Sequence, residues 1–368
     1  MEIASIVSLI NYCGGLFARG VFDSLSIHKT LKFLVNSSEI AQDVTMCILA
    51  NGVLLLGSIF LFHKAVKPLT SFLKDEIAES DVDESPVFSS IADLSVWSFY
   101  HVLWIVPVWL LCYACSYGWY QSIALHSYQM QHGVPKDIGV QKSVTTSVYA
   151  TAVWAVAFLQ IIVFDKLIPL MISTTMHVIA LVLKTMDAPL GMDLFSAIIG
   201  TTVMYPLNLL GMASHACGII LMGLMYGWYG FDMIWISDGL DLTQRYAILE
   251  KNWLYFVGFG MPYVVLVKST SFFVGYGLYL LLFPFTILIS AVSDYKVARN
   301  ELLALYRSNT QPGSSTRSKE RGAPIPPVAP LRAFRMARYV TDTMIQYIDA
   351  KLRPKRGHRG VSTSRKKN

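Results

Sequence analysis

Residues 271–292 read SFFVGYGLYLLLFPFTILISAV, a run of 22 residues without a charge. A helix needs about 20 apolar residues to cross a hydrocarbon core roughly 30 Å thick, so this run predicts a membrane-spanning helix. The rest of the chain has the same character: 54% of its 368 residues are hydrophobic and 15% are charged, whereas a soluble domain has about 25% charged residues. The composition predicts an all-α, multi-pass helical membrane bundle with the lipid bilayer as its partner.

Five earlier apolar runs raise the predicted number of hydrophobic passages to about six. They cover residues 44–62, 94–117, 143–165, 196–229 and 254–267. Apolar sequence follows the third run as far as Leu183, and Asp165, Lys166 and Pro169 are predicted to end the crossing. The fourth run is rich in small residues, which let helix backbones approach closely, so we expect it in the centre of the bundle.

The fifth run, residues 254–267, is only 14 residues long and contains Gly258, Gly260 and Pro262. We predict an interrupted helix that enters the membrane part-way. Interrupted helices expose backbone dipoles to ligands, so this segment is the best candidate for a transport path. The alternative is that this run and the next form a kinked hairpin that packs in the bundle and has no role in transport.

The sequence outside the apolar runs predicts how the chain is divided. The predicted segments are a cytosolic or interfacial N-terminal segment (1–43), the transmembrane bundle (44–295), a disordered basic linker (308–330), an amphipathic helix (331–353) and a basic tail (354–368). From Arg307 onward there are fifteen Lys and Arg and three acidic residues. Because basic residues favour the cytosolic side, this tail is predicted to be cytosolic, and six passages place both termini there.

The amphipathic helix has two readings that the sequence leaves open. Its apolar residues recur at helical spacing: Phe334, Ala337, Thr341, Met344, Ile345, Ile348 and Leu352. Basic residues flank them: Arg332, Arg335, Arg338 and Lys351. Such a helix can lie in an anionic headgroup layer with its apolar face down. Alternatively, it docks on the protein's own bundle.

No catalytic pattern accompanies these segments. The sequence contains no G-x-x-x-x-G-K-[ST], G-x-S-x-G or H-E-x-x-H motif, so we expect neither an enzyme nor a cofactor. Cys112 and Cys115 have CxxC spacing, but they lie in an apolar run without a second pair or a nearby histidine, so no metal site is predicted. The basic tail lacks interleaved aromatic residues, which argues against nucleic acid.

The chain ends Arg365-Lys366-Lys367-Asn368, which approximates the two-basic-residue retrieval signal of endoplasmic reticulum membrane proteins. Arg365 and Lys366 are the candidate signal residues. Such a signal requires a cytosolic C-terminus, which the distribution of charge also favours.

One stretch, Glu250-Lys251-Asn252-Trp253-Leu254-Tyr255-Phe256-Val257-Gly258-Phe259-Gly260-Met261-Pro262, resembles the etoposide-induced protein 2.4 family. The signature residues are Asn252, Trp253, Tyr255, Gly258, Phe259, Gly260 and Pro262. Weaker pieces follow in family order: Ala18-Arg19-Gly20, Asp23-Ser24, Asn51-Gly52, Trp104-Ile105-Val106-Pro107, Trp119-Tyr120-Gln121, Trp228-Tyr229 and Leu282-Phe283-Pro284. The chain departs from the family pattern between Leu170 and about Thr202.

This resemblance implies a protein of the endoplasmic reticulum membrane that acts in macroautophagy, at autophagosome formation and maturation, and in growth suppression or apoptosis. It implies no catalytic residues, and it leaves the protein partners and homo-oligomerisation open. The family is distantly similar to bacterial CysZ sulfate permeases, which makes passive anion transport through the interrupted fifth segment the competing hypothesis. A third reading is a lipid-handling or scaffolding protein without transport.

Overall fold

The structure is a computed structural model that describes residues 3–61, 64, 68, 106–135, 140–185, 200–310 and 328–352. Every regular element in these ranges is helical. This confirms the predicted all-α, multi-pass helical bundle. Most of the linker (311–327), the tail and the candidate signal residues Arg365 and Lys366 lie outside the described residues, as does the start of the second apolar run.

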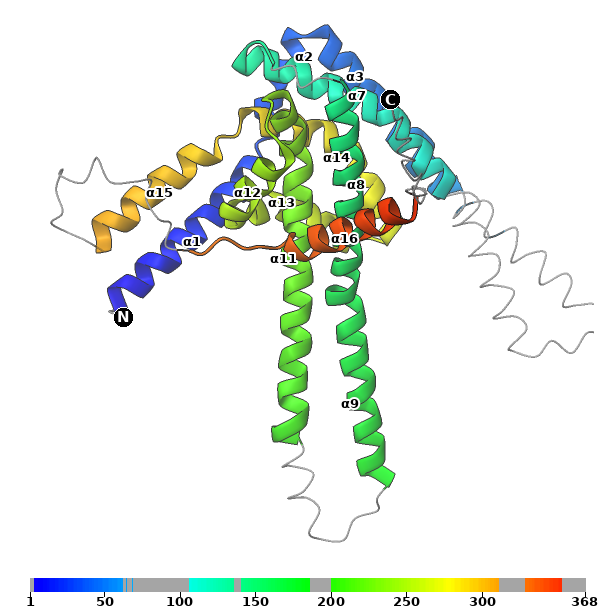
Figure 1. Cartoon of the computed structure of the whole chain (residues 1–368), viewed down its shortest axis with the longest axis vertical. Helices are drawn as coiled ribbons and strands as arrows, with labels where there is room; N and C mark the ends of the chain where they lie inside the picture. Colours follow the sequence, from blue (N-terminus) through cyan, green and yellow to red (C-terminus); the bar gives the residue numbers. More distant parts are fainter. Residues whose placement is uncertain are drawn as a thin grey trace, which may run out of the picture. The chain divides into compact units, whose positions relative to one another are not determined.

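The chain divides into two compact units. The first comprises residues 1–138 and 212–331. Its helices are α1 (Ile3–Ser24), η1 (Ile27–Thr30), α2 (Leu31–Asn36), α3 (Ser38–Ile48), the π-helix η2 (Leu49–Leu56), α4 (Gly57–Leu61), α7 (Val106–His132), most of α11 (Tyr205–Ser237), α12 (Leu242–Lys251), α13 (Trp253–Lys268), α14 (Phe272–Val292) and α15 (Tyr295–Thr310). In this unit α1 packs against α13 and α15, and α14 packs against α7, α13 and η2 (Figure 1).

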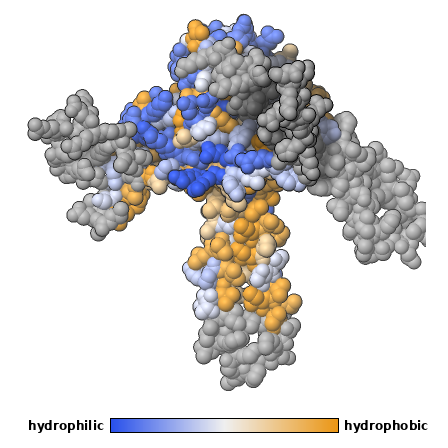
Figure 2. All heavy atoms as spheres, in the orientation of Figure 1, coloured by the Kyte–Doolittle hydropathy of each residue, from blue (hydrophilic) through white to orange (hydrophobic). Residues whose placement is uncertain are grey.

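The second unit comprises residues 139–211 and 332–368. It contains α8 (Val140–Ile162), the π-helical turn η5 (Val163–Leu167), α9 (Ile168–Thr185), the π-helical turn η6 (Gly200–Met204) and α16 (Arg335–Leu352). Within this unit α16 packs on α8. The surface over α9 is predominantly apolar, with Leu170, Met171 and Leu181 exposed (Figure 2). Such a surface is suited to lipid.

Five helical stretches in the described residues are long and apolar enough to cross a membrane: Ser5–Ser24, Ser38–Leu61, Tyr149–Val182, Thr201–Ser237 and Val274–Val292. The shorter apolar helix α13 completes the set. The last stretch lies inside the 271–292 run, and α14 begins one residue after the start of that run. These helices make the chain a multi-pass membrane protein.

The helix does not end at Asp165, Lys166 and Pro169, because it continues to Thr185, and the end of the membrane crossing at these residues stays a prediction. A proline has no N–H and its ring clashes with the carbonyl four residues earlier. The π-helical turn η5 lies just before Pro169 and spreads the backbone there, so the chain stays helical past the proline. The same arrangement recurs at Pro206, which follows η6.

The N-terminal helix α1 is part of the bundle in this structure. It lies in the segment 1–43, whose cytosolic or interfacial position stays a prediction, and it packs along α13, with Tyr12 and Leu16 buried beside Leu303 of α15. Hydrophobic packing therefore begins well before residue 44. The predicted cytosolic location of the N-terminus is a separate matter and stays a prediction.

Candidate functional site

The signature residues begin at the corner between α12 and α13. Asp241 caps α12, and its backbone N–H donates to the Gln244 side chain (3.0 Å) in a capping box. At the other end, the Asn252 amide donates to the Ile248 carbonyl (2.8 Å) and accepts from the Arg299 guanidinium (3.4 Å). Asn252 thus ends α12, begins α13 and joins both to α15.

Trp253 holds the end of the predicted linker and the residue that follows it. Its indole N–H donates to the Ala329 carbonyl (3.2 Å), and the Leu331 N–H donates to the Glu250 carbonyl (3.0 Å). Val328 packs against the Tyr12, Leu16 and Leu303 cluster. Residues 328–331 are therefore fastened to the corner by two hydrogen bonds and an apolar contact.

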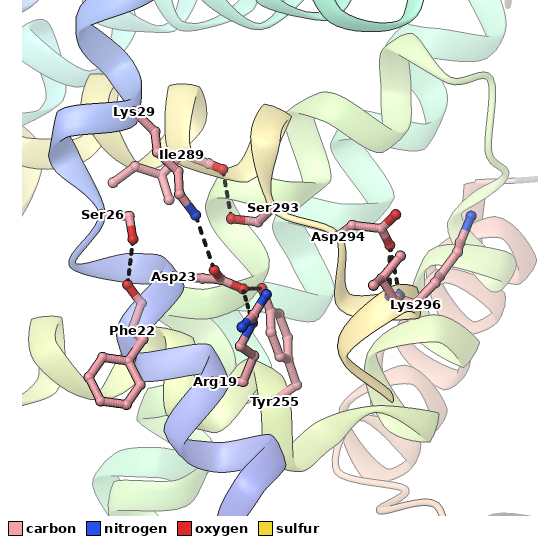
Figure 3. Close-up of polar contacts among 11 residues, drawn as sticks. Arg19, Phe22, Asp23, Ser26, Lys29, Tyr255, Ile289, Ser293, Asp294 and Lys296 are labelled. Atoms are coloured by element: carbon pink, nitrogen blue, oxygen red, sulfur yellow. Dashed lines mark hydrogen bonds and ion pairs between the residues drawn. The ribbon is translucent and has the colours of Figure 1, made fainter. Parts of the chain in front are cut away.

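Tyr255 connects α13 to α1 through a buried carboxylate (Figure 3). Its hydroxyl donates to Asp23, 232 positions earlier in the chain, at 2.8 Å. The same carboxylate faces Lys29 (3.4 Å) and Arg19 (3.8 Å). A buried carboxylate is costly unless it is paired and hydrogen-bonded, and here both conditions are met.

Gly258 and Gly260 lie inside a continuous α-helix, so the predicted interruption of the fifth passage is wrong. A methyl group at Gly258 would overlap the Phe17 carbonyl of α1. One at Gly260 would overlap the Gly223 carbonyl of α11. Two helix backbones therefore cross α13 on different faces at positions where only glycine fits. Gly20 of α1 makes the reciprocal contact, since its added methyl would overlap the Tyr255 carbonyl.

The remaining signature residues lie on the same helix. Phe259 is fully buried and meets the Phe231 ring of α11 edge-on, with 4.9 Å between centroids. Pro262 also lies within α13, where it lacks the N–H that would otherwise bond the Gly258 carbonyl. The whole signature therefore positions α1, α11, α12 and α15 around α13. The pathway of exposed amides that the anion hypothesis requires is not found in α13.

Sequence reasoning missed two buried polar groups. Asp232 of α11 forms an ion pair with Arg245 of α12, whose residue is 2% exposed. The predicted fourth run ends at residue 229, which leaves Asp232 just outside it. An acidic residue three positions after an apolar run could have indicated a buried ion pair. Asn51, in the π-helix η2, places its amide nitrogen 3.0 to 3.3 Å from three acceptors, the Cys47 carbonyl and the Ser116 and Tyr120 hydroxyls, which share its two hydrogens. It belongs to a family motif but was not assigned a role.

Each of these buried polar groups is bonded to a structural neighbour: Asp232 to Arg245, and Asn51 to residues of its own helix and of α7. Neither set combines a nucleophile with a base and an acid. Among the described residues, no group of three or more His, Cys, Asp or Glu is placed to hold a metal ion. The five cysteines are free thiols, and the Cys112 thiol donates to the Ala50 carbonyl (3.5 Å). The arrangement can hold helices and a terminal segment in place.

Comparison with known proteins gives two curated relatives. The chain is 23% identical over 281 residues to a protein of Arabidopsis thaliana named "Protein EI24 homolog", covering 74% of this chain and 81% of that protein. It is 19% identical over 275 residues to the "Protein EI24 homolog" of Dictyostelium discoideum, covering 74% of this chain and 71% of that protein. No family model and no solved structure matches the chain.

Proposed function

We propose a function on the premise that the chain belongs to the etoposide-induced protein 2.4 family, which both relatives support. It is a non-enzymatic, multi-pass protein of the endoplasmic reticulum membrane. It supports macroautophagy, at autophagosome formation and maturation, and growth-suppression signalling. It acts through contacts with lipid and with protein partners, and both of its termini are cytosolic.

The observation that favours this proposal is the role of the signature residues in packing. Trp253 and Tyr255 hold residues 328–331 and α1 to α13, and Gly258 and Gly260 admit two neighbouring backbones. A signature devoted to assembling helices suits a protein that acts by presenting surfaces. The continuity of α13 removes the feature on which the anion pathway was predicted.

The test is autophagic flux in cells lacking the protein. Reintroducing the full chain restores flux, whereas the Trp253→Phe variant, which loses the hydrogen bond to Ala329 but keeps an aromatic ring, restores less of it. Tyr205→Phe, at an exposed position, is the matched control and restores flux fully. Full rescue by the Trp253 variant at equal protein level would remove the proposed role of the docked segment.

A transport assay separates this proposal from the competing hypothesis. Purified protein in vesicles is expected to admit labelled sulfate and chloride no faster than protein-free vesicles do. Saturable flux from folded, inserted protein would contradict the proposal and return attention to the Gly258–Pro262 segment.

Localisation is tested at the chain's end. Replacing Arg365 and Lys366 with alanine is expected to let the protein escape from the endoplasmic reticulum to later membranes, as seen by microscopy. The matched control replaces Arg356 and Arg359, which carry the same charge outside the candidate signal. Equal retention of both variants would exclude Arg365 and Lys366 as the retrieval signal.

A further inference from the structure

The amphipathic helix α16 has one face that is covered by its own unit. Phe334, Ala337 and Thr341 recur at helical spacing and are at most 2% exposed. The Phe334 ring meets the Trp154 ring of α8 edge-on, with 5.4 Å between centroids. The Tyr149 hydroxyl of α8 donates to Asp342 (2.7 Å). These contacts fix both the rotation of α16 and its position along α8.

The opposite face of α16 is exposed although it is rich in apolar and aromatic groups. Met336, Tyr339 and Tyr347 are all more than half exposed, and Tyr339 reaches 72%. Arg335, the first residue of the helix, and Arg332, three residues before it, are exposed as well. A surface that combines apolar side chains, tyrosines and arginines matches the boundary between acyl chains and headgroups, where rings are half-buried and guanidinium groups meet phosphate.

The position of α16 along α8 agrees with that boundary. Lys142 is the last charged residue before the third apolar run, and Tyr149, which holds Asp342 of α16, lies seven residues, or about 10.5 Å, further along α8. Interfacial helices lie at a depth of about 5 to 10 Å in the headgroup and acyl boundary. Furthermore, α16 runs across α8, as a helix in the membrane plane must (Figure 1).

We propose that α16 lies in the membrane plane, with its inner face on α8 and its Met336, Tyr339 and Tyr347 face in the headgroup layer of anionic phospholipids, which Arg332 and Arg335 recognise. The two sequence-based readings of this helix, lipid contact and docking, are then both correct, each for a different face. This goes beyond the proposed role in autophagy and does not depend on it.

The test uses spin labels on the full-length, cysteine-free protein in nanodiscs that each hold one copy. A label at Tyr339→Cys is compared with one at Val134→Cys, a 92% exposed position after α7. In nanodiscs with anionic lipid, the label at 339 is expected to collide with apolar oxygen and be shielded from a water-soluble nickel chelate. The label at 134 is expected to meet the chelate freely.

The arginines are tested in the same system. Each basic residue near an anionic surface contributes about a fivefold preference, so Arg332→Gln with Arg335→Gln should lower the ratio of immersed to water-exposed label at 339 roughly thirty-fold. In neutral nanodiscs the double variant should change little. Equal chelate access at 339 and 134 would refute lipid contact. If the label at 339 stayed shielded from the chelate without anionic lipid and with both arginines replaced, headgroup recognition would be refuted. If it were shielded only when a disc held several copies, the partner of this face would be a second copy of the chain.

Discussion

At the scale of single residues, glycine decides how closely three helices approach one another. Gly258 faces the Phe17 carbonyl of α1, and Gly260 faces the Gly223 carbonyl of α11. Both contacts are with backbone, which cannot move aside as a flexible side chain can. An added methyl group must therefore push whole helices apart, and overpacking of this kind typically costs about 1 to 3 kcal/mol.

Gly260→Ala is accordingly expected to destabilise the purified protein by about 1 to 3 kcal/mol, read as a lower midpoint of thermal unfolding. Gly118→Ala in α7 is the matched control, because nothing lies within 4 Å of its added methyl group. There, alanine should be neutral or stabilise the helix by up to about 1 kcal/mol. If both substitutions gave the same midpoint, the close crossing of α13 and α11 would be wrong.

Tyr255→Phe tests the buried carboxylate. The substitution removes a 2.8 Å hydrogen bond to Asp23 while keeping the ring, so the protein should lose about 1.5 to 3 kcal/mol, the usual contribution of a bond to a charged group. Chemical denaturation in detergent measures the loss. Tyr205→Phe removes a hydroxyl from an exposed ring and should leave the midpoint unchanged. A Tyr255 variant as stable as this control would show that Arg19 and Lys29 suffice for Asp23.

At the scale of elements, the start of α15 combines a cap with a titrating group. Asp294 accepts from the Lys296 and Val297 N–H groups at 2.9 and 3.1 Å. Burial and, secondarily, the Asp294 charge raise the pKa of Tyr295 from its ordinary value of 10.0 to about 12. The pKa of Tyr128, buried and hydrogen-bonded to Asp238, is also raised.

These shifts predict a loss of stability in alkali. Below pH 10 both the folded and the unfolded chain keep the Tyr295 proton, so its contribution is complete. Between pH 10 and about 12 only the unfolded chain releases it, and stability falls by about 2 kcal/mol. Unfolding monitored by circular dichroism from pH 9 to 12 should show a shallower decline for Tyr295→Phe than for the natural chain. Identical slopes would contradict the raised pKa.

Local pattern predicted some elements better than others. The ends of α14 agree with the uncharged run to within one residue, because length and apolarity are local properties. The prediction from Gly258, Gly260 and Pro262 is wrong, because glycine is common both where a helix breaks and where two helix backbones cross closely. The choice depends on Phe17 and Gly223, which are distant in the sequence. Likewise, the partner of Asp23 is Tyr255, a contact that only the fold provides.

At the scale of the whole molecule, the charge of the C-terminal region determines the expected orientation in the membrane. Its fifteen basic and three acidic residues from Arg307 onward favour the cytosolic side. The N-terminal stretch Ser5–Ser24 is itself long and apolar enough to cross. Whether the two termini share a side therefore depends on how α1 lies relative to the bilayer.

We expect both termini to be cytosolic. A cysteine-free protein carrying Glu2→Cys or Asn368→Cys should react with a membrane-impermeant maleimide once the plasma membrane alone is permeabilised. A protein that carries both cysteines shows the maleimide labelling expected when both termini are accessible. Labelling at position 2 that required permeabilised endoplasmic reticulum would show instead that α1 crosses the membrane.

The continuous helix formed by α8, η5 and α9 is longer than the hydrocarbon core of a bilayer is thick. Its apolar stretch Tyr149–Val182 measures about 51 Å, whereas the hydrocarbon core is roughly 30 Å thick. With α16 lying across the first half of α8 in one headgroup layer, the surplus of about 20 Å has to be taken up by tilt or by protrusion at the α9 end. Because that surplus grows as a bilayer thins, the molecule carries a built-in preference among membranes of different thickness.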